Sequence, residues 1–330
     1  MQNTLCRVYS PYKPGSLNIT GEQNNNIHKQ KKETMQKNTD YLIRGLVKDK
    51  NIRFSFTDTT ATVQEGILIH SCDPVSGLLF ARALTTAALI SPLLGEKEKY
   101  SLKWEYKGLI GTILVDVTEN CELRGIPKNT MLMEEAATVK DLYGEEGQIT
   151  VIKFSEGAVL SSGTAPSGML EVCDDIAFYF STSDQIETEF NIRTEFKPDP
   201  DAPVKCNSGF MLQAMPGCDL EEFLAYRKQL LSVNVDNLLQ DKRIPTEKKL
   251  WKILENIFDM DYSSLSEKYG VSYKFAASPV YKCSCSREKI EASVRMLDKK
   301  ELDEIRKKGE NLKVVCHFCN TEYTISPDSL

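Results

Sequence analysis

The sequence predicts an α/β (α+β) core domain, followed by a helical linker and a small C-terminal domain that contains four clustered cysteines. Three observations lead to this prediction. Up to about residue 215, short stretches rich in Ile, Val, Phe and Tyr alternate with longer helical stretches. After Pro216 the pattern becomes that of amphipathic helices. From about residue 276 onward the chain is short and polar, and it holds two tight pairs of cysteines.

Composition limits the class of protein. The 330 residues are 41% hydrophobic, enough for a sizeable core and, by length, for two or three domains. The ten cysteines make up about 3% of the chain, well below the roughly 8 to 10% of a secreted disulfide scaffold. No secretory signal and no apolar run of about 18 residues stands out. We therefore expect a soluble protein of a reducing compartment, the cytoplasm, with no membrane partner.

The charge balance also limits the partners. The formal net charge of −6 argues against general attraction to nucleic acid or to anionic membranes, because both depend on a basic surface. We therefore expect no nucleic-acid partner.

Residues 1–34 are expected to form an extension and no domain. They contain three consecutive asparagines, a basic cluster and little apolar periodicity, which predicts a disordered, solvated segment. An organelle transit segment and a natural start at Met35 are the alternatives.

Residues 35–215 are predicted to form the core domain. Residues 77–94 and 167–185 have helical spacing, and the strand-like stretches are bounded by Gly, Pro or Asn. This mixture indicates an α/β domain with enough core to stand alone. The predicted strands are Leu102–Tyr106, Gly111–Thr118, Gln148–Phe154, Glu189–Phe196 and Phe210–Met215.

Residues 216–275 are predicted to form a helical linker. Asp219 and Glu222 have the spacing of a capping box, and a second helix follows Pro245. Neither amphipathic helix can bury its stripe alone, so the linker must pack on the core domain, on a partner, or on both in turn. The first stripe contains Leu220, Phe223, Leu224, Leu231, Val235, Leu238 and Leu239, and the second contains Leu250, Leu254, Ile257 and Phe258.

Residues 276–330 are predicted to bind one Zn²⁺. The pairs Cys283/Cys285 and Cys316/Cys319 are about thirty residues apart in a segment too short and polar for a core of its own. The four cysteines are therefore poorly explained as small buried core residues. A reducing compartment also disfavours structural disulfides between them. Four thiolates satisfy a tetrahedral Zn²⁺, which leaves metal binding as the interpretation.

The residues around these pairs complete the prediction. Asp298 and Glu301 indicate a helix start and Gly309 a helix end, so the insert is a folded spacer. We expect His317 to lie outside the coordination sphere, because Cys316 and Cys319 already occupy that corner. The six scattered cysteines are expected to be core or surface residues; they are Cys6, Cys72, Cys121, Cys173, Cys206 and Cys218.

A four-cysteine site can serve a nucleic-acid reader, a structural clip or a redox switch. Residues 286–315 hold nine basic and seven acidic residues and no aromatic residue on which a base could stack. This composition weakens the interpretation as a nucleic-acid reader. The thiol oxidoreductase alternative fits poorly, since strand-like residues and no helix follow Cys319. A switch is chemically reasonable, because zinc-bound sulfur is already the reactive thiolate and oxidation to a disulfide ejects the metal. We find no motif of a turnover enzyme.

The sequence resembles the heat-shock protein 33 family of redox-regulated holdase chaperones. The resemblance rests on the CxC in "CSCSRE", on the CxxC about thirty residues later, and on "FNIRTEF", "GFMLQAMPG" and "CELRGI", and it covers roughly residues 38–330. It implies that the reduced, zinc-bound chain is a poorly active monomer. It also implies that peroxide or hypochlorite with heat forms Cys283–Cys285 and Cys316–Cys319 disulfides, releases zinc and unfolds the linker.

The resemblance further implies that the oxidised protein, often a homodimer, binds unfolding client proteins without ATP and later passes them to ATP-driven foldase chaperones. Four linker residues are a hypothesis for client binding, with burial in the core as the alternative: Phe223, Leu224, Leu231 and Leu238. The competing function is a constitutive zinc-stabilised interaction or RNA-binding module, which oxidation would inactivate.

Overall fold

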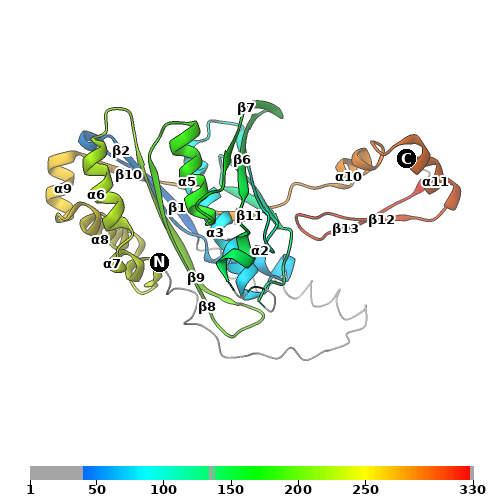
Figure 1. The fold of residues 1–330 in the computed structure, drawn as a ribbon, viewed down its shortest axis with the longest axis horizontal. Coiled ribbons are helices and arrows are strands. Elements are labelled where there is room, and N and C mark those ends of the chain that lie inside the picture. The colour runs from blue at the N-terminus through cyan, green and yellow to red at the C-terminus, as the bar shows by residue number, and fades with distance from the viewer. Residues whose placement is uncertain (1–39, 134–135, 137, 328–330) are drawn as a thin grey trace. The chain divides into compact units, whose positions relative to one another are not determined.

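The computed structural model describes residues 40–133, 136 and 138–327. The predictions for residues 1–34 and for Cys6 lie outside this part of the chain. Within it, strands form a five-stranded sheet of order β10-β1-β2-β9-β8, a six-stranded sheet of order β11-β5-β4-β3-β6-β7 and a two-stranded ribbon. Figure 1 shows the two larger sheets with helices between them, and further helices on the outer face of the five-stranded sheet.

The five-stranded sheet is antiparallel throughout, and its central strands β2 and β9 are covered on both faces. Its strands are rich in β-branched and aromatic residues, which favour a pleated, buried surface. Strand β8 contains the predicted stretch Glu189–Phe196, and β9 contains the predicted stretch Phe210–Met215 except for Met215. The other three strands were not predicted. The strands are β1 Tyr41–Val47, β2 Ile52–Asp58, β8 Thr188–Phe196, β9 Val204–Ala214 and β10 Val271–Ala277.

The six-stranded sheet buries one face. Along β3 every second residue is buried, as the period of two requires when one side faces a core. All neighbouring strands run antiparallel except β11, which lies parallel to β5. The three strands predicted here are confirmed within β3, β4 and β6. The strands are β3 Glu98–Tyr106, β4 Thr112–Thr118, β5 Glu122–Pro127, β6 Gly147–Ser155, β7 Ala158–Pro166 and β11 Val280–Tyr281.

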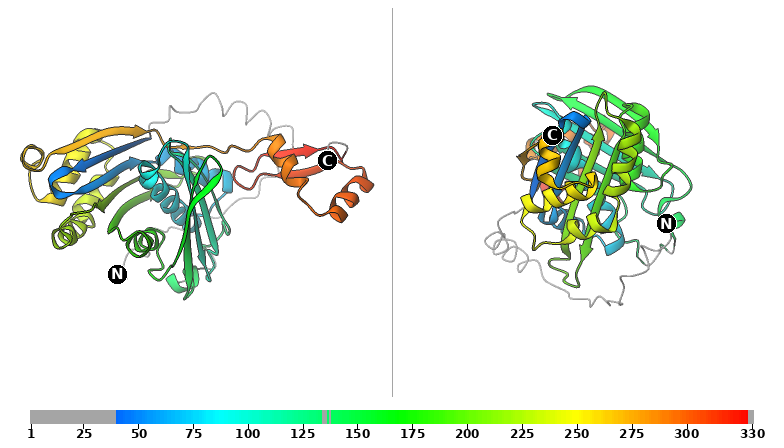
Figure 2. Two further views of the ribbon diagram at one scale, coloured as in Figure 1. Left: turned by 90° about the horizontal axis from the view of Figure 1, so that it is seen from above. Right: turned by 90° about the vertical axis from the view of Figure 1, so that its left-hand side faces the viewer.

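Helices fill the layer between the two sheets (Figure 2). The central one, α3, is almost wholly buried, and by length and composition Pro74–Leu93 is apolar enough to span a membrane. The expectation of no such run was therefore wrong, but 78% of this stretch is buried inside the protein, as in the core helix of a globular domain. The elements of this layer and its edges are α2 Thr60–His70, α3 Pro74–Ile90, η2 Ser91–Leu93, α4 Val139–Tyr143 and α5 Val172–Ser183. The turn between β1 and β2, η1 Lys48–Lys50, lies against α9 Tyr262–Tyr269 instead.

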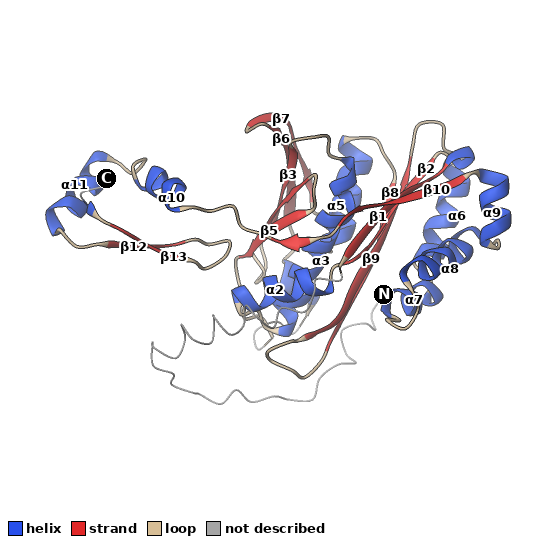
Figure 3. Cartoon of the chain, turned by 180° about the vertical axis from the view of Figure 1, so that it is seen from behind, coloured by secondary structure: helices blue, strands red, loops and turns tan. Residues whose placement is uncertain are grey.

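The linker helices cover the other face of the five-stranded sheet (Figure 3). Their buried residues join Phe54, Phe56 and Phe210 of the sheet in one apolar cluster, which we call the linker cluster. The linker therefore packs on the core domain in this state. The helices are α6 Leu220–Leu230, α7 Val233–Gln240, α8 Thr246–Phe258 and α9 Tyr262–Tyr269.

The first predicted stripe is broken in the structure. The Asp219 side chain caps α6 as predicted, but Glu222 makes an ion pair with Lys50. The Ser232 side chain caps a new helix, α7, so the chain changes direction there. As a result, residues placed on one stripe by spacing alone are divided between the core and the surface.

The linker ends as part of the core sheet. After α9, strand β10 pairs antiparallel with β1, with Val271 opposite Val47 and Ala277 opposite Leu42. The chain then forms β11 and enters the C-terminal segment. The spacer helix capped by Asp298 and ended by Gly309 is confirmed. The elements of this segment are α10 Arg287–Val294, α11 Lys299–Lys308, β12 Leu312–Val315 and β13 Glu322–Ile325.

Candidate metal centre

The four paired cysteines converge at one point. Cys283 and Cys285 lie in the extended chain after β11, and Cys316 and Cys319 lie in the tight turn between β12 and β13. Their four Sγ atoms all lie within 4.8 Å of one another. The predicted convergence of the two pairs is therefore found.

The turn that carries the second pair is fixed by its backbone. The amides of Cys319 and Asn320 donate to the Cys316 carbonyl at 3.3 and 2.8 Å, and the Cys316 amide donates to the Thr321 carbonyl at 2.9 Å. Asn320 adopts a left-handed φ of 54°, which asparagine tolerates better than most residues. This local closure brings the two thiols of a CxxC pair onto the same side of the turn.

The spacing of the sulfurs fits a tetrahedral metal. Cys283 Sγ lies 3.7 Å from Cys316 Sγ, and Cys285 Sγ lies 3.4 Å from Cys319 Sγ. Four sulfurs bound at about 2.3 Å to one tetrahedral ion would be about 3.8 Å apart. Four thiols are also a donor set that suits soft or borderline metals. The cluster can therefore hold one metal ion with small adjustments.

The surroundings of the cluster also favour thiolate at one of its members. Burial alone would raise the pKa of Cys319, but hydrogen bonds from Thr321 and the neighbouring thiols lower that pKa to about 7. The Tyr323 hydroxyl lies 3.0 Å from Cys285 Sγ, where it can donate to a thiolate. Burial raises the pKa of Cys283, Cys285 and Cys316, so without a metal Cys319 is the thiol that most readily becomes the deprotonated ligand that a metal requires.

The comparisons with known proteins identify the family. The sequence model of the Hsp33 protein family matches residues 40–326. The chain belongs to the Hsp33 family. The 33 kDa chaperonin of Clostridium perfringens strain SM101 is 30% identical over 88% of this chain and 90% of its own length. The protein of the same name from Clostridium beijerinckii is 32% identical over 88% of this chain and 97% of its own length.

The fold agrees with this assignment. The crystal structure of the 33 kDa chaperonin of Thermotoga maritima matches with a TM-score of 0.71 and 28% identity, covering 88% of this chain and 96% of the other. The Hsp33 family is a family of molecular chaperones, so the predicted family and fold class are confirmed.

The remaining cysteines and His317 lie outside the cluster. His317 is exposed and is not among the four grouped side chains. The scattered cysteines in the described part of the chain divide between core and partly exposed positions, as predicted. Cys121, Cys173 and Cys206 are buried, whereas Cys72 and Cys218 are partly exposed.

The cysteine turn of this Hsp33 family member is docked on the core domain, which the sequence did not predict. The Phe318 ring lies over the guanidinium of Arg124, a residue of β5, at 4.1 Å. The Tyr281 hydroxyl donates to the Phe318 carbonyl at 2.8 Å, and the Asn320 amide group donates to the Ile69 carbonyl at 2.6 Å. No local pattern signals these contacts, because the partners are separated by up to 251 residues.

Arg124 also lies beside the metal centre itself. Burial would lower the pKa of this guanidinium, but Asp116 and Cys283 beside it more than offset burial and raise the pKa. Four thiolates and one divalent ion would carry a net charge of −2, which a neighbouring cation stabilises. The core domain therefore contributes charge and contact to the cysteine cluster.

The four residues suggested for client binding do not form one surface. Phe223 is buried in the linker cluster, and Leu238 packs partly against it. Leu224 and Leu231 are 53% and 49% exposed. The structure therefore brings together only Phe223 and Leu238.

Proposed function

We propose that this protein is a redox-regulated, ATP-independent holdase with one Zn²⁺ per chain in the reduced state. The single observation that carries the proposal is the cluster of four thiols within 4.8 Å in a chaperone of the Hsp33 family. Structural Zn²⁺ is the common occupant of four-cysteine tetrahedral sites. Cys283, Cys285, Cys316 and Cys319 are the proposed ligands.

The proposed switch converts these ligands into disulfides. Formation of one disulfide removes two electrons from a pair of thiolates. Hydrogen peroxide accepts these two electrons as its O–O bond breaks, and its two oxygens leave as water or hydroxide. A disulfide sulfur is a poor zinc ligand, so the ion is released. The pairing that we propose is Cys283–Cys285 and Cys316–Cys319. The short distances in the structure join Cys283 to Cys316 and Cys285 to Cys319. In a tetrahedral cluster every sulfur is near the other three, so these distances do not argue against the proposed pairing.

Loss of zinc acts on the linker through the chain itself. Without the ion, the turn that holds Phe318 and Asn320 loses its main support, because zinc binding in such modules contributes about 10 to 16 kcal/mol. The docking contacts with Arg124 and Ile69 then open. In the chain, β10 is followed by β11 and then by the metal centre. When the metal centre opens, β10 loses the ordered segment that follows it. The linker helices lie directly before β10, so the loss reaches them through this strand.

The surface proposed for clients is the linker cluster with its cover removed. Phe54, Phe56 and Phe210 are at most 1% exposed while the linker helices are packed. Unfolding of the linker would uncover this sheet face and would also free Phe223 and Leu238, in addition to Leu224 and Leu231, which are already about half exposed. Large exposed apolar patches bind other apolar chains, as a holdase requires. We further propose the cytoplasm as its compartment, homodimer formation after oxidation and transfer of clients to ATP-driven foldase chaperones.

The test follows zinc and chaperone activity in one sample. We expect peroxide with mild heat to release about one zinc per chain and, at the same time, to suppress thermal aggregation of a client protein, whereas the reduced protein does neither. Zinc release can be read with a chromophoric chelator and aggregation by light scattering. Oxidised protein that has lost zinc and remains inert would show that the cysteines are a structural clip.

Arg124→Gln is expected to weaken the hold on the metal. The change removes the cation beside Cys283 and the platform under Phe318, a contact whose usual free energy is about 0.5 to 2 kcal/mol. Zinc release under a fixed peroxide dose should then be about 2- to 30-fold faster. Lys103→Gln is the control, because it removes only an exposed ion pair with Glu105 on the same sheet. Equal release rates in the two variants would show that the docking contact does not support the centre.

A further inference from the structure

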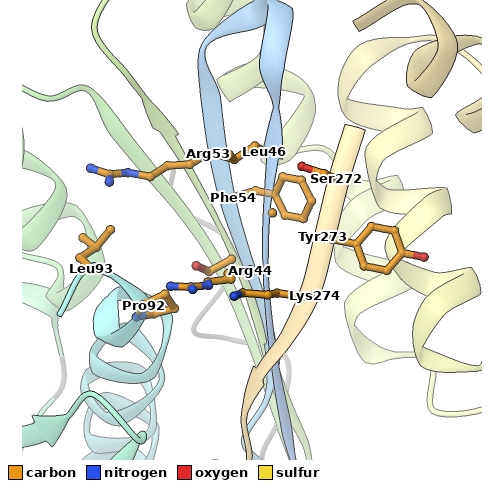
Figure 4. A pocket seen from close by; sticks show the side chains of 11 residues that line it. Arg44, Leu46, Arg53, Phe54, Pro92, Leu93, Ser272, Tyr273 and Lys274 are labelled. Atoms are coloured by element: carbon orange, nitrogen blue, oxygen red, sulfur yellow. The ribbon is translucent and has the colours of Figure 1, made fainter. Parts of the chain in front are cut away.

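A basic pocket lies on the five-stranded sheet, away from the cysteines. It has a volume of about 380 Å³, within the roughly 300 to 1,000 Å³ of small-ligand sites. Three adjacent strands form its floor, and η2, directly after α3, forms one wall. Figure 4 shows Arg44, Arg53 and Lys274 around it, with Pro92 and Leu93 on the η2 side.

The register places the three cations close together. Lys274 of β10 is directly opposite Arg44 of β1, and Arg53 of β2 is opposite Leu46, two residues along β1 from Arg44. All three side chains therefore leave the same face of the sheet. Like charges at directly opposed positions destabilise a sheet, so the pairing of Arg44 with Lys274 has a cost that a bound anion would remove.

Carboxylates do not neutralise this group. Among the described residues, no Asp or Glu makes an ion pair with Arg44, Arg53 or Lys274. The Arg53 Nε donates to Gln213 at 2.6 Å, a neutral partner that orients the guanidinium. Burial lowers the pKa of Arg53, and Tyr100 offsets this only in part. Three uncompensated cations in a chain of net charge −6 are a local exception.

We propose that this pocket binds a phosphate-bearing small ligand, with the phosphate between Arg44, Arg53 and Lys274. Three cations match a multiply charged phosphate better than a carboxylate, which has one charge, and arginine forks suit phosphate oxygens. The hydroxyls of Ser55 and Ser272 line the same pocket and can donate further hydrogen bonds.

The ligand also has room for an apolar part. Pro92 and Leu93 line the side of the pocket toward η2, and Leu46 lines it from β1 on the sheet (Figure 4). Free pyrophosphate would use the cations alone, whereas a nucleotide would also place its base or sugar against these side chains. Both share the phosphate chemistry, and the experiment distinguishes them.

The position of the pocket gives the ligand a regulatory role, and this step rests on the proposed function. Ser272, Tyr273 and Lys274 belong to β10, whereas Arg44, Arg53 and Ser55 belong to β1 and β2. The complete site therefore exists only while β10 is paired with β1. A ligand that binds only the paired state lowers the population of the detached state by 1 + [L]/Kd, about 100-fold at 100 Kd. Phosphate ligands would thus hold the chaperone in its reduced, closed state.

The first experiment measures binding to the reduced, zinc-loaded full chain by calorimetry at fixed ionic strength. Pyrophosphate, AMP and adenosine are titrated in separate arms. Inorganic phosphate is titrated in a fourth arm. We expect saturable binding of pyrophosphate, none of adenosine, and tighter binding of AMP than of inorganic phosphate if the apolar wall is used. Arg44→Gln and Lys274→Gln should each weaken pyrophosphate binding by at least about tenfold, since a charge-assisted hydrogen bond is lost.

Lys248→Gln is the matched control, because it removes one exposed lysine of α8 outside the pocket. Thermal unfolding of all three variants shows that they are folded. The proposal is overturned if pyrophosphate gives no saturable binding, or if the three variants bind it equally well. A second experiment adds saturating pyrophosphate before peroxide and should slow zinc release. Binding without any slowing would uphold the site and overturn the regulatory step, and neither result depends on whether oxidation creates holdase activity.

Discussion

Cys285→Ser is expected to abolish stoichiometric zinc binding and to unfold the C-terminal segment. Cys285 Sγ lies 3.4 Å from Cys319 Sγ and 3.0 Å from the Tyr323 hydroxyl, so its loss removes one corner of the cluster. A four-cysteine centre in a segment with little apolar core depends on the metal for folding. The expected loss is a large part of about 10 to 16 kcal/mol, comparable to the stability of a whole domain.

The measurement combines metal analysis with limited proteolysis of the reduced protein. We expect zinc to fall from about one per chain to near zero, and new cleavage to appear between residues 283 and 325. Cys218→Ser is the matched control, because Cys218 is a partly exposed thiol at the start of the linker and is not part of the cluster. Full zinc occupancy in Cys285→Ser would show that three thiols suffice and that the centre does not need all four cysteines.

Features with a local cause could be predicted from the sequence. Asp219 and Asp298 each cap a helix where the spacing predicted one, because capping depends on residues within one turn. The convergence of the two cysteine pairs could be predicted because a short polar segment leaves metal binding as the best explanation for four thiols. The strands of the six-stranded sheet that were predicted, such as β3, alternate clearly between buried and partly exposed residues.

Features that depend on distant partners could not be predicted. Strand β10 alternates apolar and polar residues from Val271 to Phe275, but none of its residues is buried, and it is a strand because β1 offers it an edge more than 200 residues earlier. The Arg124–Phe318 contact and the basic pocket likewise arise from pairings across the fold. The division of the linker stripe at Ser232 was missed because the spacing of Leu231, Val235 and Leu238 fits one long helix as well as two short ones.

Leu254→Ala is expected to activate the chaperone without oxidation. Leu254 is fully buried in α8, which packs against α6, α7 and α9 and belongs to the linker cluster on the sheet. Truncation of a buried leucine costs about 2 to 5 kcal/mol, because it removes apolar contact and leaves a cavity. The metal centre is untouched. If linker packing is what keeps the client surface covered, the uncovered population of the reduced protein should rise about 30-fold or more, at about 1.4 kcal/mol per factor of ten.

The readout is suppression of client aggregation by reduced protein that still holds its zinc. Leu220→Ala is the matched control, since Leu220 lies on α6 but is 54% exposed and should change stability by less than about 0.5 kcal/mol. We expect Leu254→Ala to suppress aggregation and Leu220→Ala to behave like the unmodified protein. A lower melting temperature for Leu254→Ala with no gain in suppression would mean that uncovering the sheet is not sufficient. Client binding would then also require the C-terminal segment to change on oxidation, because the mutation leaves that segment folded around its zinc.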